Sequence, residues 1–200
     1  SLKALQSFIE GYKIGPNRVS TEVLATSPSA YQLFPHPLMD WIMTSDGRAL
    51  HRDQFDTEIW RRFQWSIYNP DTRKMICKRF ATAEQCQQYL AVLERYFAKN
   101  LERARRFTWA LSVNAQLQKT HFIVFGSDCF LTPSRTIVEE IDGISTLRLY
   151  PDDLTNKVRN VDYEKLMLDP GDGTVTKPSL LARQTLDPTV ARHRYSHFPL

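Results

Sequence analysis

The clearest hydrophobic pattern in this 200-residue chain lies between Thr82 and Ala110. Apolar residues recur there every three to four positions with charged residues opposite, a period typical of an amphipathic helix. Thr82-Ala83-Glu84-Gln85 fits a capping box, in which a hydroxyl and a Gln side chain satisfy free backbone donors. We therefore predict a helix from about Ala83 to Ala110. The stripe expected in the core consists of Cys86, Leu90, Leu93, Phe97, Leu101 and Ala104.

Shorter patterns predict further elements. Leu2 to Gly11 has apolar residues on one helical face, with Gly11 as the stop, and Phe55 to Trp65 has similar spacing. His121 to Phe125 is a continuous apolar run, as expected of a strand buried on both faces, and Thr146 to Tyr150 alternates like a strand. Prolines predict an irregular segment between the first helix and the aromatic-rich region. These are Pro16, Pro28, Pro35 and Pro37.

The most informative stretch for chemistry is an acidic glycine turn near the end of the chain. Tyr163 to Leu168 predicts a strand, Pro170-Gly171 a reversal, and Thr174 to Thr176 a second extended run, with a helix over Ser179 to Gln184. Asp172 lies between two glycines, so its carboxylate can project from the turn. One interpretation is an Asx turn that only stabilises a loop. The other is an acid at a strand end that orients a histidine.

Three segments in order along the chain carry a family resemblance. They are Thr26 to Pro35, Gly126 to Asp128 with Thr132-Pro133, and Gly171 to Val175 followed by Ser179-Leu180-Leu181. Together they resemble motifs of the lecithin:cholesterol acyltransferase family, α/β-hydrolases that include phospholipid:diacylglycerol acyltransferases and lysosomal phospholipase-type enzymes. Phe34 stands where that family often has Leu, a conservative departure.

The resemblance implies an α/β fold, specifically a partial α/β-hydrolase fold with a helix-rich cap. Residues 1–35 would be a core helix and a proline-rich crossing segment, 36–118 the cap, and 119–200 the part of the core that carries the acid. In that family a serine attacks a lipid ester, a histidine takes its proton, and the aspartate, here Asp172, holds the histidine. Water or an acceptor alcohol such as a sterol or diacylglycerol then resolves the acyl-enzyme. No cofactor and no metal are implied.

The other triad members are not evident in the sequence. No G-x-S-x-G occurs, so the turn that presents a hydrolase serine is missing, and we expect a carboxyl-terminal fragment that is inactive alone. His193 and His197 follow Asp172, but we interpret them as part of a solvated basic loop and expect the catalytic histidine beyond Leu200. The alternatives are a non-catalytic binding module derived from a hydrolase, and an esterase or thioesterase on the same scaffold.

The composition limits the classes of partner and the compartment that we expect for this protein. A net charge of +4 is mild, and the basic run Arg103 to Arg106 lies at a helix end, where cations complement the helix dipole, so we expect no nucleic acid partner. No apolar run reaches the length of a membrane span. Trp60 and Trp65 in the cap suit either a lipid–water interface or internal packing. The odd count of three cysteines favours a reducing compartment such as the cytoplasm, with secretion left open.

Overall fold

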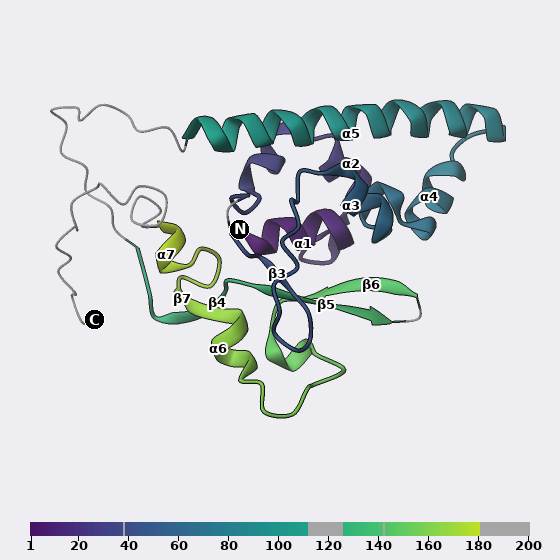
Figure 1. Ribbon diagram of the computed structural model, residues 1–200. Helices are drawn as coiled ribbons and strands as arrows, with labels where there is room; N and C mark the ends of the chain where they lie inside the picture. Colours follow the sequence, from purple (N-terminus) through teal and green to yellow (C-terminus); the bar gives the residue numbers. More distant parts are fainter. Residues whose placement is uncertain (38, 112–125, 142, 181–200) are drawn as a thin grey trace, which may run out of the picture.

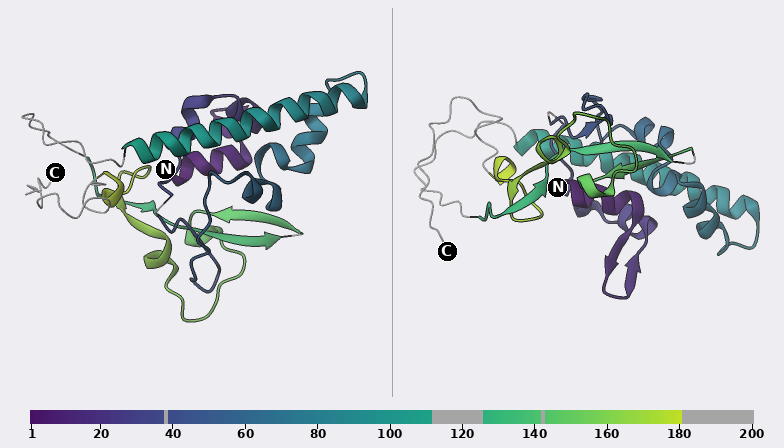
Figure 2. Two further views of the ribbon diagram at one scale, coloured as in Figure 1. Left: turned by 45° about the horizontal axis from the view of Figure 1, so that its top comes forward. Right: turned by 90° about the horizontal axis from the view of Figure 1, so that it is seen from below.

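The computed structural model describes residues 1–37, 39–111, 126–141 and 143–180. The protein is of mixed α/β class, with helices and small separate sheets (Figure 1). The long helix α5 (Ala83–Leu111) runs along one side of the molecule, and the short helices of the first half lie beneath it. A three-stranded sheet lies on the other side of these short helices (Figure 2).

The first elements follow the predicted start of the chain. Helix α1 (Leu2–Glu10) ends at Gly11, whose φ of 87° is the left-handed conformation that a glycine stop supplies. The segment predicted to be irregular contains several short elements. A hairpin of β1 (Tyr12–Ile14) and β2 (Asn17–Val19) projects from the body (Figure 2), and helix α2 (Thr21–Ala25) and the 3₁₀ helix η1 (Pro28–Leu33) follow.

The aromatic-rich region forms three short helices. These are α3 (Thr57–Arg62), the 3₁₀ helix η2 (Ser66–Tyr68) and α4 (Pro70–Cys77). The predicted helix Phe55 to Trp65 is therefore too long at both ends. It starts late because the Asp56 carboxylate accepts a hydrogen bond from the backbone N–H of Glu58 (2.9 Å) and caps the helix there. It ends early because Gln64 and Ser66 take positive φ values of 54° and 55°.

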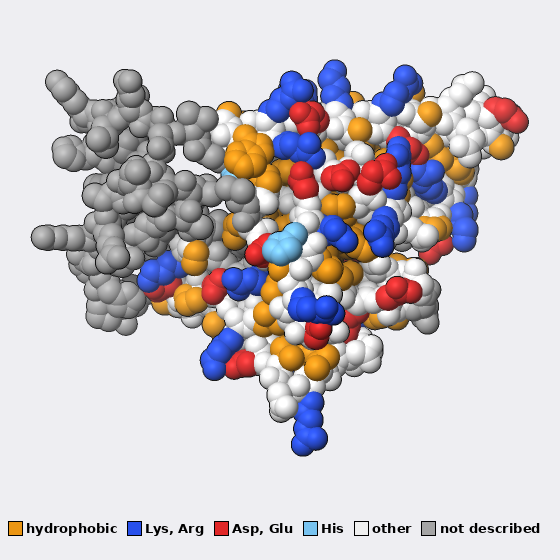
Figure 3. All heavy atoms as spheres, in the orientation of Figure 1, with side chains coloured by type: hydrophobic (Ala, Val, Ile, Leu, Met, Phe, Trp, Pro, Cys, Tyr) orange, Lys and Arg blue, Asp and Glu red, His pale blue; other side chains and the backbone are white. Residues whose placement is uncertain are grey.

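The prediction for the long helix is confirmed. The hydroxyl of Thr82 accepts a hydrogen bond from the backbone N–H of Gln85 (3.3 Å), and α5 begins at Ala83. All six residues of the predicted stripe are buried, in one core with α1 and η1. The opposite face is solvent-exposed, and Lys and Arg side chains gather along this edge of the molecule (Figure 3).

Burial of the tryptophans decides between the two interpretations of Trp60 and Trp65. Both are at most 2% exposed, as is Trp41. Each indole N–H donates to a backbone carbonyl inside the protein: Trp60 to Gln54 (2.8 Å) and Trp65 to Ser145 (2.6 Å). These side chains are internal packing, and the interpretation of Trp60 and Trp65 as a lipid-facing surface is wrong.

The main sheet joins parts of the chain that are far apart in sequence. The short β3 (Ile42–Met43) pairs in parallel with β5 (Thr136–Ile141), and β6 (Ile144–Arg148) pairs antiparallel with β5. The predicted strand Thr146 to Tyr150 thus begins and ends two residues earlier. Strand β3 lies within the predicted cap 36–118 but shares a sheet with β5. All three predicted segments, 1–35, 36–118 and 119–200, also contribute to one hydrophobic core. The division into three parts stays a prediction.

The prediction of a strand over Tyr163 to Leu168 is wrong. After the 3₁₀ helix η3 (Pro151–Asp153) the chain forms helix α6 (Tyr163–Met167), because the Asp162 carboxylate accepts from the backbone N–H of Lys165 (3.2 Å). Tyr163 and Met167, four residues apart, bury the same helix face. Only then does β7 (Leu168–Gly171) begin, antiparallel to β4 (Phe130–Pro133).

The end of the described chain is also less extended than predicted. Thr174 to Thr176 forms no strand; Thr176 alone makes an isolated bridge with Gly171. Helix α7 spans Lys177–Leu180, two residues before the predicted start. The rest of that predicted helix, the predicted strand His121 to Phe125, and both His193 and His197 lie outside the described residues.

A disulfide joins Cys77 at the end of α4 to Cys86 in α5, and Cys129 is free and exposed. The odd cysteine count therefore conceals one pair. Disulfides persist mainly in oxidising compartments, so the argument for a reducing compartment loses its basis. Among the described residues, no helix combines the length and the apolar character needed to cross a bilayer.

Candidate functional site

Asp172 lies in a tight turn between β7 and α7. One carboxylate oxygen, Oδ1, accepts hydrogen bonds from the backbone N–H groups of Thr174 and Val175, both at 2.7 Å. The backbone N–H of Asp172 donates to the carbonyl of Val175 (3.2 Å) and closes the turn. The side chain is exposed, and Oδ2 makes no hydrogen bond with any described residue. One oxygen of Asp172 thus holds the turn and the other faces solvent.

The turn also sets the charge of this carboxyl group. The N–H of Val175, then that of Thr174, lower the pKa of Asp172, and the positive charge of Lys3 acts in the same direction. Hydrogen bonds to the charged form favour ionisation. Asp172 is therefore a carboxylate at neutral pH. In this state it can accept a hydrogen bond from a donor such as an imidazole N–H.

Thr132 and two glycines hold the turn against β4. The backbone N–H of Gly173 donates to the Thr132 hydroxyl (2.8 Å), and this threonine is fully buried. A Cβ on Gly171 would come within 2.3 Å of the Val175 carbonyl oxygen and 2.7 Å of Thr132 Oγ1, so only glycine fits there. Gly173 has a φ of +88°. Both glycines beside Asp172 are thus required by the backbone.

Hydrogen bonds connect this turn to parts of the chain that are distant in sequence. The Ser1 hydroxyl, at the start of α1, donates to the carbonyl of Thr174 (3.1 Å), and the Ser1 backbone nitrogen donates to the carbonyl of Leu33. Thr132 contributes from β4. Of the segments that carry the family resemblance, 126–133 therefore contacts 171–175 directly, and 26–35 is connected to the turn through Ser1. Sequence analysis selected each segment, but their proximity is a finding of the structure.

The described residues do not bring a histidine to Asp172. Their histidines are His36 and His51, and His51 Nδ1 lies 2.8 Å from a carboxylate oxygen of Asp40. Both side chains of this pair are more than half exposed, and no described serine hydrogen-bonds to His51, so the pair lacks a nucleophile. The sequence gives no signal for this pair. Asp40 and His51 are eleven residues apart, on either side of the turn after β3, and belong to no recognisable motif.

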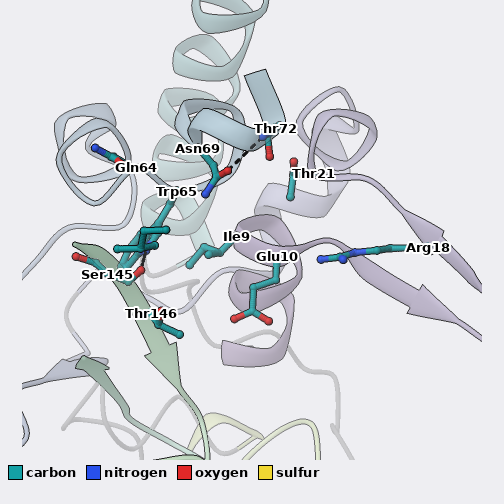
Figure 4. Close-up of a pocket in the computed structure, with 11 residues that line it drawn as sticks. Ile9, Glu10, Arg18, Thr21, Gln64, Trp65, Asn69, Thr72, Ser145 and Thr146 are labelled. Carbon is teal, nitrogen blue, oxygen red and sulfur yellow. Dashed lines mark hydrogen bonds between the residues drawn. The ribbon is translucent and has the colours of Figure 1, made fainter. Parts of the chain in front are cut away.

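A polar pocket of about 370 Å³ lies at the other end of α1 (Figure 4). Glu10 and Arg18 line it together with residues from α2, α4 and β6. In the close-up the Arg18 side chain extends from the hairpin toward Glu10. The nine-residue helix α1 leads from Ser1 to Glu10 at this pocket, about 13 Å along the axis. The pocket is therefore separate from the Asp172 turn.

Comparisons with known proteins add no family to these observations. No protein-family model, no curated protein and no solved structure matches the chain. Within the described ranges, no group of three or more His, Cys, Asp and Glu side chains is arranged to hold a metal ion. The Asp172 turn is thus the candidate site that sequence and geometry identify together.

Proposed function

We propose that this protein acts in a lipid acyltransferase or lipase of the serine hydrolase type, on the scaffold of an α/β-hydrolase, with Asp172 as the acid of the Ser-His-Asp triad. The observation that carries the proposal is the Asp172 turn, which segment 126–133 contacts through Thr132 and to which segment 26–35 is connected through Ser1. A loop-stabilising aspartate needs one hydrogen-bonded oxygen. This turn has that oxygen and, in addition, an ionised Oδ2 directed to solvent.

The geometry fits the physical task of a triad acid. Two backbone N–H groups fix Oδ1, so the carboxylate cannot rotate freely, and Oδ2 is left to accept the Nδ1–H of an imidazole. That bond sets the tautomer and orientation of the histidine and stabilises the imidazolium that forms when the serine attacks the ester. The serine and the histidine belong to the proposal; among the described residues neither contacts Asp172.

The test is Asp172→Asn in the full-length protein, assayed on phosphatidylcholine with and without diacylglycerol as acceptor. The Asn side-chain oxygen still accepts from Thr174 and Val175, so the turn is retained, but its NH₂ group is a donor and cannot accept a hydrogen bond from the imidazole Nδ1–H. We expect kcat to fall by about 10⁴-fold with little change in KM. The melting temperature should stay that of the wild type.

Asp169→Asn is the matched control, because Asp169 lies in the neighbouring β7 and its carboxylate makes no hydrogen bond with a described residue. It should keep full activity. If Asp172→Asn retains near wild-type turnover, Asp172 only stabilises the loop. If the wild type cleaves short esters, thioesters or peptides but no lipid, the esterase or thioesterase alternative replaces the lipid substrate.

We also propose that the protein works in an oxidising compartment. The Cys77–Cys86 disulfide supports this, since cytosolic thiols are kept reduced. Counting free thiols in denatured protein isolated from its native source tests it directly. One reactive thiol, that of Cys129, is the expected result, and three would place the protein in a reducing compartment.

A further inference from the structure

The outer face of α5 carries a row of basic side chains. Arg95, Lys99, Arg103 and Arg106 are all exposed and, at 3.6 residues per turn, project from one side of the helix over about 17 Å. Arg95, Lys99 and Arg103 form no ion pair with any described residue. Arg106 pairs with Glu102, its own neighbour four residues earlier. The row is therefore a set of positive charges that the rest of the described protein leaves largely uncompensated.

The acidic residues of the same stretch neutralise only one member of this row, Arg106. Glu94 faces inward, where it pairs with Arg61 of α3 and Arg73 of α4. Glu102 is shared between Arg106 and Arg105, and Arg105 also pairs with Asp53 at 2.9 Å. Three of the four cations of the row, Arg95, Lys99 and Arg103, thus have no carboxylate partner among the described residues.

Large apolar side chains flank the basic row on the same helix. Tyr96, Phe107 and Trp109 are 38%, 39% and 43% exposed, although most of the other aromatic rings in the described part of the chain are buried. Amphipathic aromatics beside Lys and Arg are typical of surfaces that lie in the headgroup region of a bilayer. Figure 3 shows the Lys and Arg side chains projecting along the edge formed by α5. The exposed aromatic rings therefore border the basic row, Tyr96 and Phe107 on one side of it and Trp109 on the other.

This face ends close to the Asp172 turn. The Trp109 ring contacts His36 (5.2 Å between centroids), and three residues before His36 the carbonyl of Leu33 accepts from Ser1. Ser1 in turn donates to Thr174 of the turn. The last turns of α5 and the β7–α7 region lie at the same end of the molecule (Figures 1 and 2). A surface bound along α5 would thus lie near the candidate site.

We propose that the outer face of α5, from Arg95 to Trp109, docks the protein on a bilayer that contains anionic phospholipid. The choice of a bilayer over other anionic partners rests on the proposed function, since a lipid ester must be taken from such a surface. The cations bind the headgroup phosphates, and Phe107 and Trp109 enter the interface. Electrostatic attraction makes this docking sensitive to salt.

The test is co-sedimentation of the full-length protein with vesicles of phosphatidylcholine, alone or with about a quarter phosphatidylglycerol. We expect binding to the anionic vesicles at about 0.1 M NaCl and its loss near 1 M. Each basic residue at such a surface strengthens binding about fivefold, so Lys99→Gln with Arg103→Gln should weaken binding about 30-fold. Lys99→Arg with Arg103→Lys should restore it.

The matched control removes the same charge from another surface. Lys157 and Arg159 are exposed, lie in the loop between η3 and α6, and form no ion pair with a described residue. Lys157→Gln with Arg159→Gln should bind vesicles like the wild type. If both double variants weaken binding equally, only net charge matters and the α5 face is not the docking surface.

Two further outcomes would overturn the proposal. Binding to neutral and anionic vesicles alike would exclude docking through the basic row. Tight binding of duplex DNA, lost in the α5 double variant while vesicles are not bound, would assign the face to nucleic acid. These measurements need no turnover, so they are independent of Asp172→Asn. A variant that fails to dock but still hydrolyses a water-soluble ester would leave the catalytic proposal intact.

Discussion

The aromatic core and the Asp172 turn are stabilised in opposite ways. In the core, Phe8, Tyr31, Phe97 and Trp60 contact one another ring to ring and exclude water almost completely. The Asp172 turn buries little apolar surface and depends on backbone hydrogen bonds and two glycines. Packing gives a rigid support with no chemistry of its own. The turn places one exposed carboxylate on that support.

The largest stability effect is expected in the core. Phe97 is fully buried and contacts Tyr31, Trp60 and Tyr68, so Phe97→Ala should lower the free energy of unfolding by about 3–5 kcal/mol in a urea titration. Val92→Ala, on the exposed face of the same helix, should change it by at most about 0.5 kcal/mol. Equal effects would mean that the α5 stripe does not pack as described.

An intermediate effect is expected at Glu139, the buried carboxylate of β5. It accepts from the backbone N–H groups of Thr155 and Asn156 and pairs with Arg148 (3.0 Å). Burial alone raises the pKa of Glu139, but these hydrogen bonds and the Arg148 charge outweigh it and the pKa is lowered. Glu139→Gln should therefore cost about 2–4 kcal/mol at pH 7.

The pH dependence gives this prediction its sign. A carboxyl group whose pKa is lower in the folded state stabilises the fold above its unfolded pKa, and this stabilisation is lost as pH falls through the folded value. The difference in unfolding free energy between wild type and Glu139→Gln should hence shrink as pH falls below about 4. A difference in unfolding free energy that is constant from pH 7 to pH 3 would contradict an ionised Glu139 in the folded protein.

The smallest stability effect is expected at the turn, where function should change more than stability. Thr132→Val keeps the shape but removes the acceptor of the Gly173 N–H, at a cost of about 1–2 kcal/mol. Because the turn positions Asp172, kcat should fall by up to about 100-fold. Thr136→Val is the control: its hydroxyl is buried without a partner among the described residues, so its loss should be neutral or stabilising.

Periodic patterns in the sequence predicted the helices that pack on the core, and local chemistry decided the rest. The α5 stripe and the Gly11 stop could be predicted because one period and one residue type determine them. Tyr163 to Leu168 is too short for a period to separate helix from strand; the missed signal was Asp162 as a cap. The pairing of Cys77 with Cys86 follows from how α4 meets α5, which spacing alone does not encode.

The candidate site shows the same limit. The glycines around Asp172 were sufficient to predict an exposed carboxylate in a tight turn. The contacts of Ser1 and Thr132 with this turn depend on the tertiary fold and were not accessible from local sequence. The tryptophans show why residue type alone misleads, since Trp60 and Trp65 carry a polar N–H yet satisfy it internally.

The parallel pairing of β3 with β5 also constrains how the chain can acquire its structure. Ile42 finds its partner, Thr136, only after the whole of α5 has been synthesised. Contacts of such high sequence separation slow folding, because the loop entropy is lost before the pairing is gained. During translation the helices can therefore assemble first, while the edge of β3 that later pairs with β5 remains unpaired. A nascent chain stalled before Thr136 would be the species most exposed to aggregation.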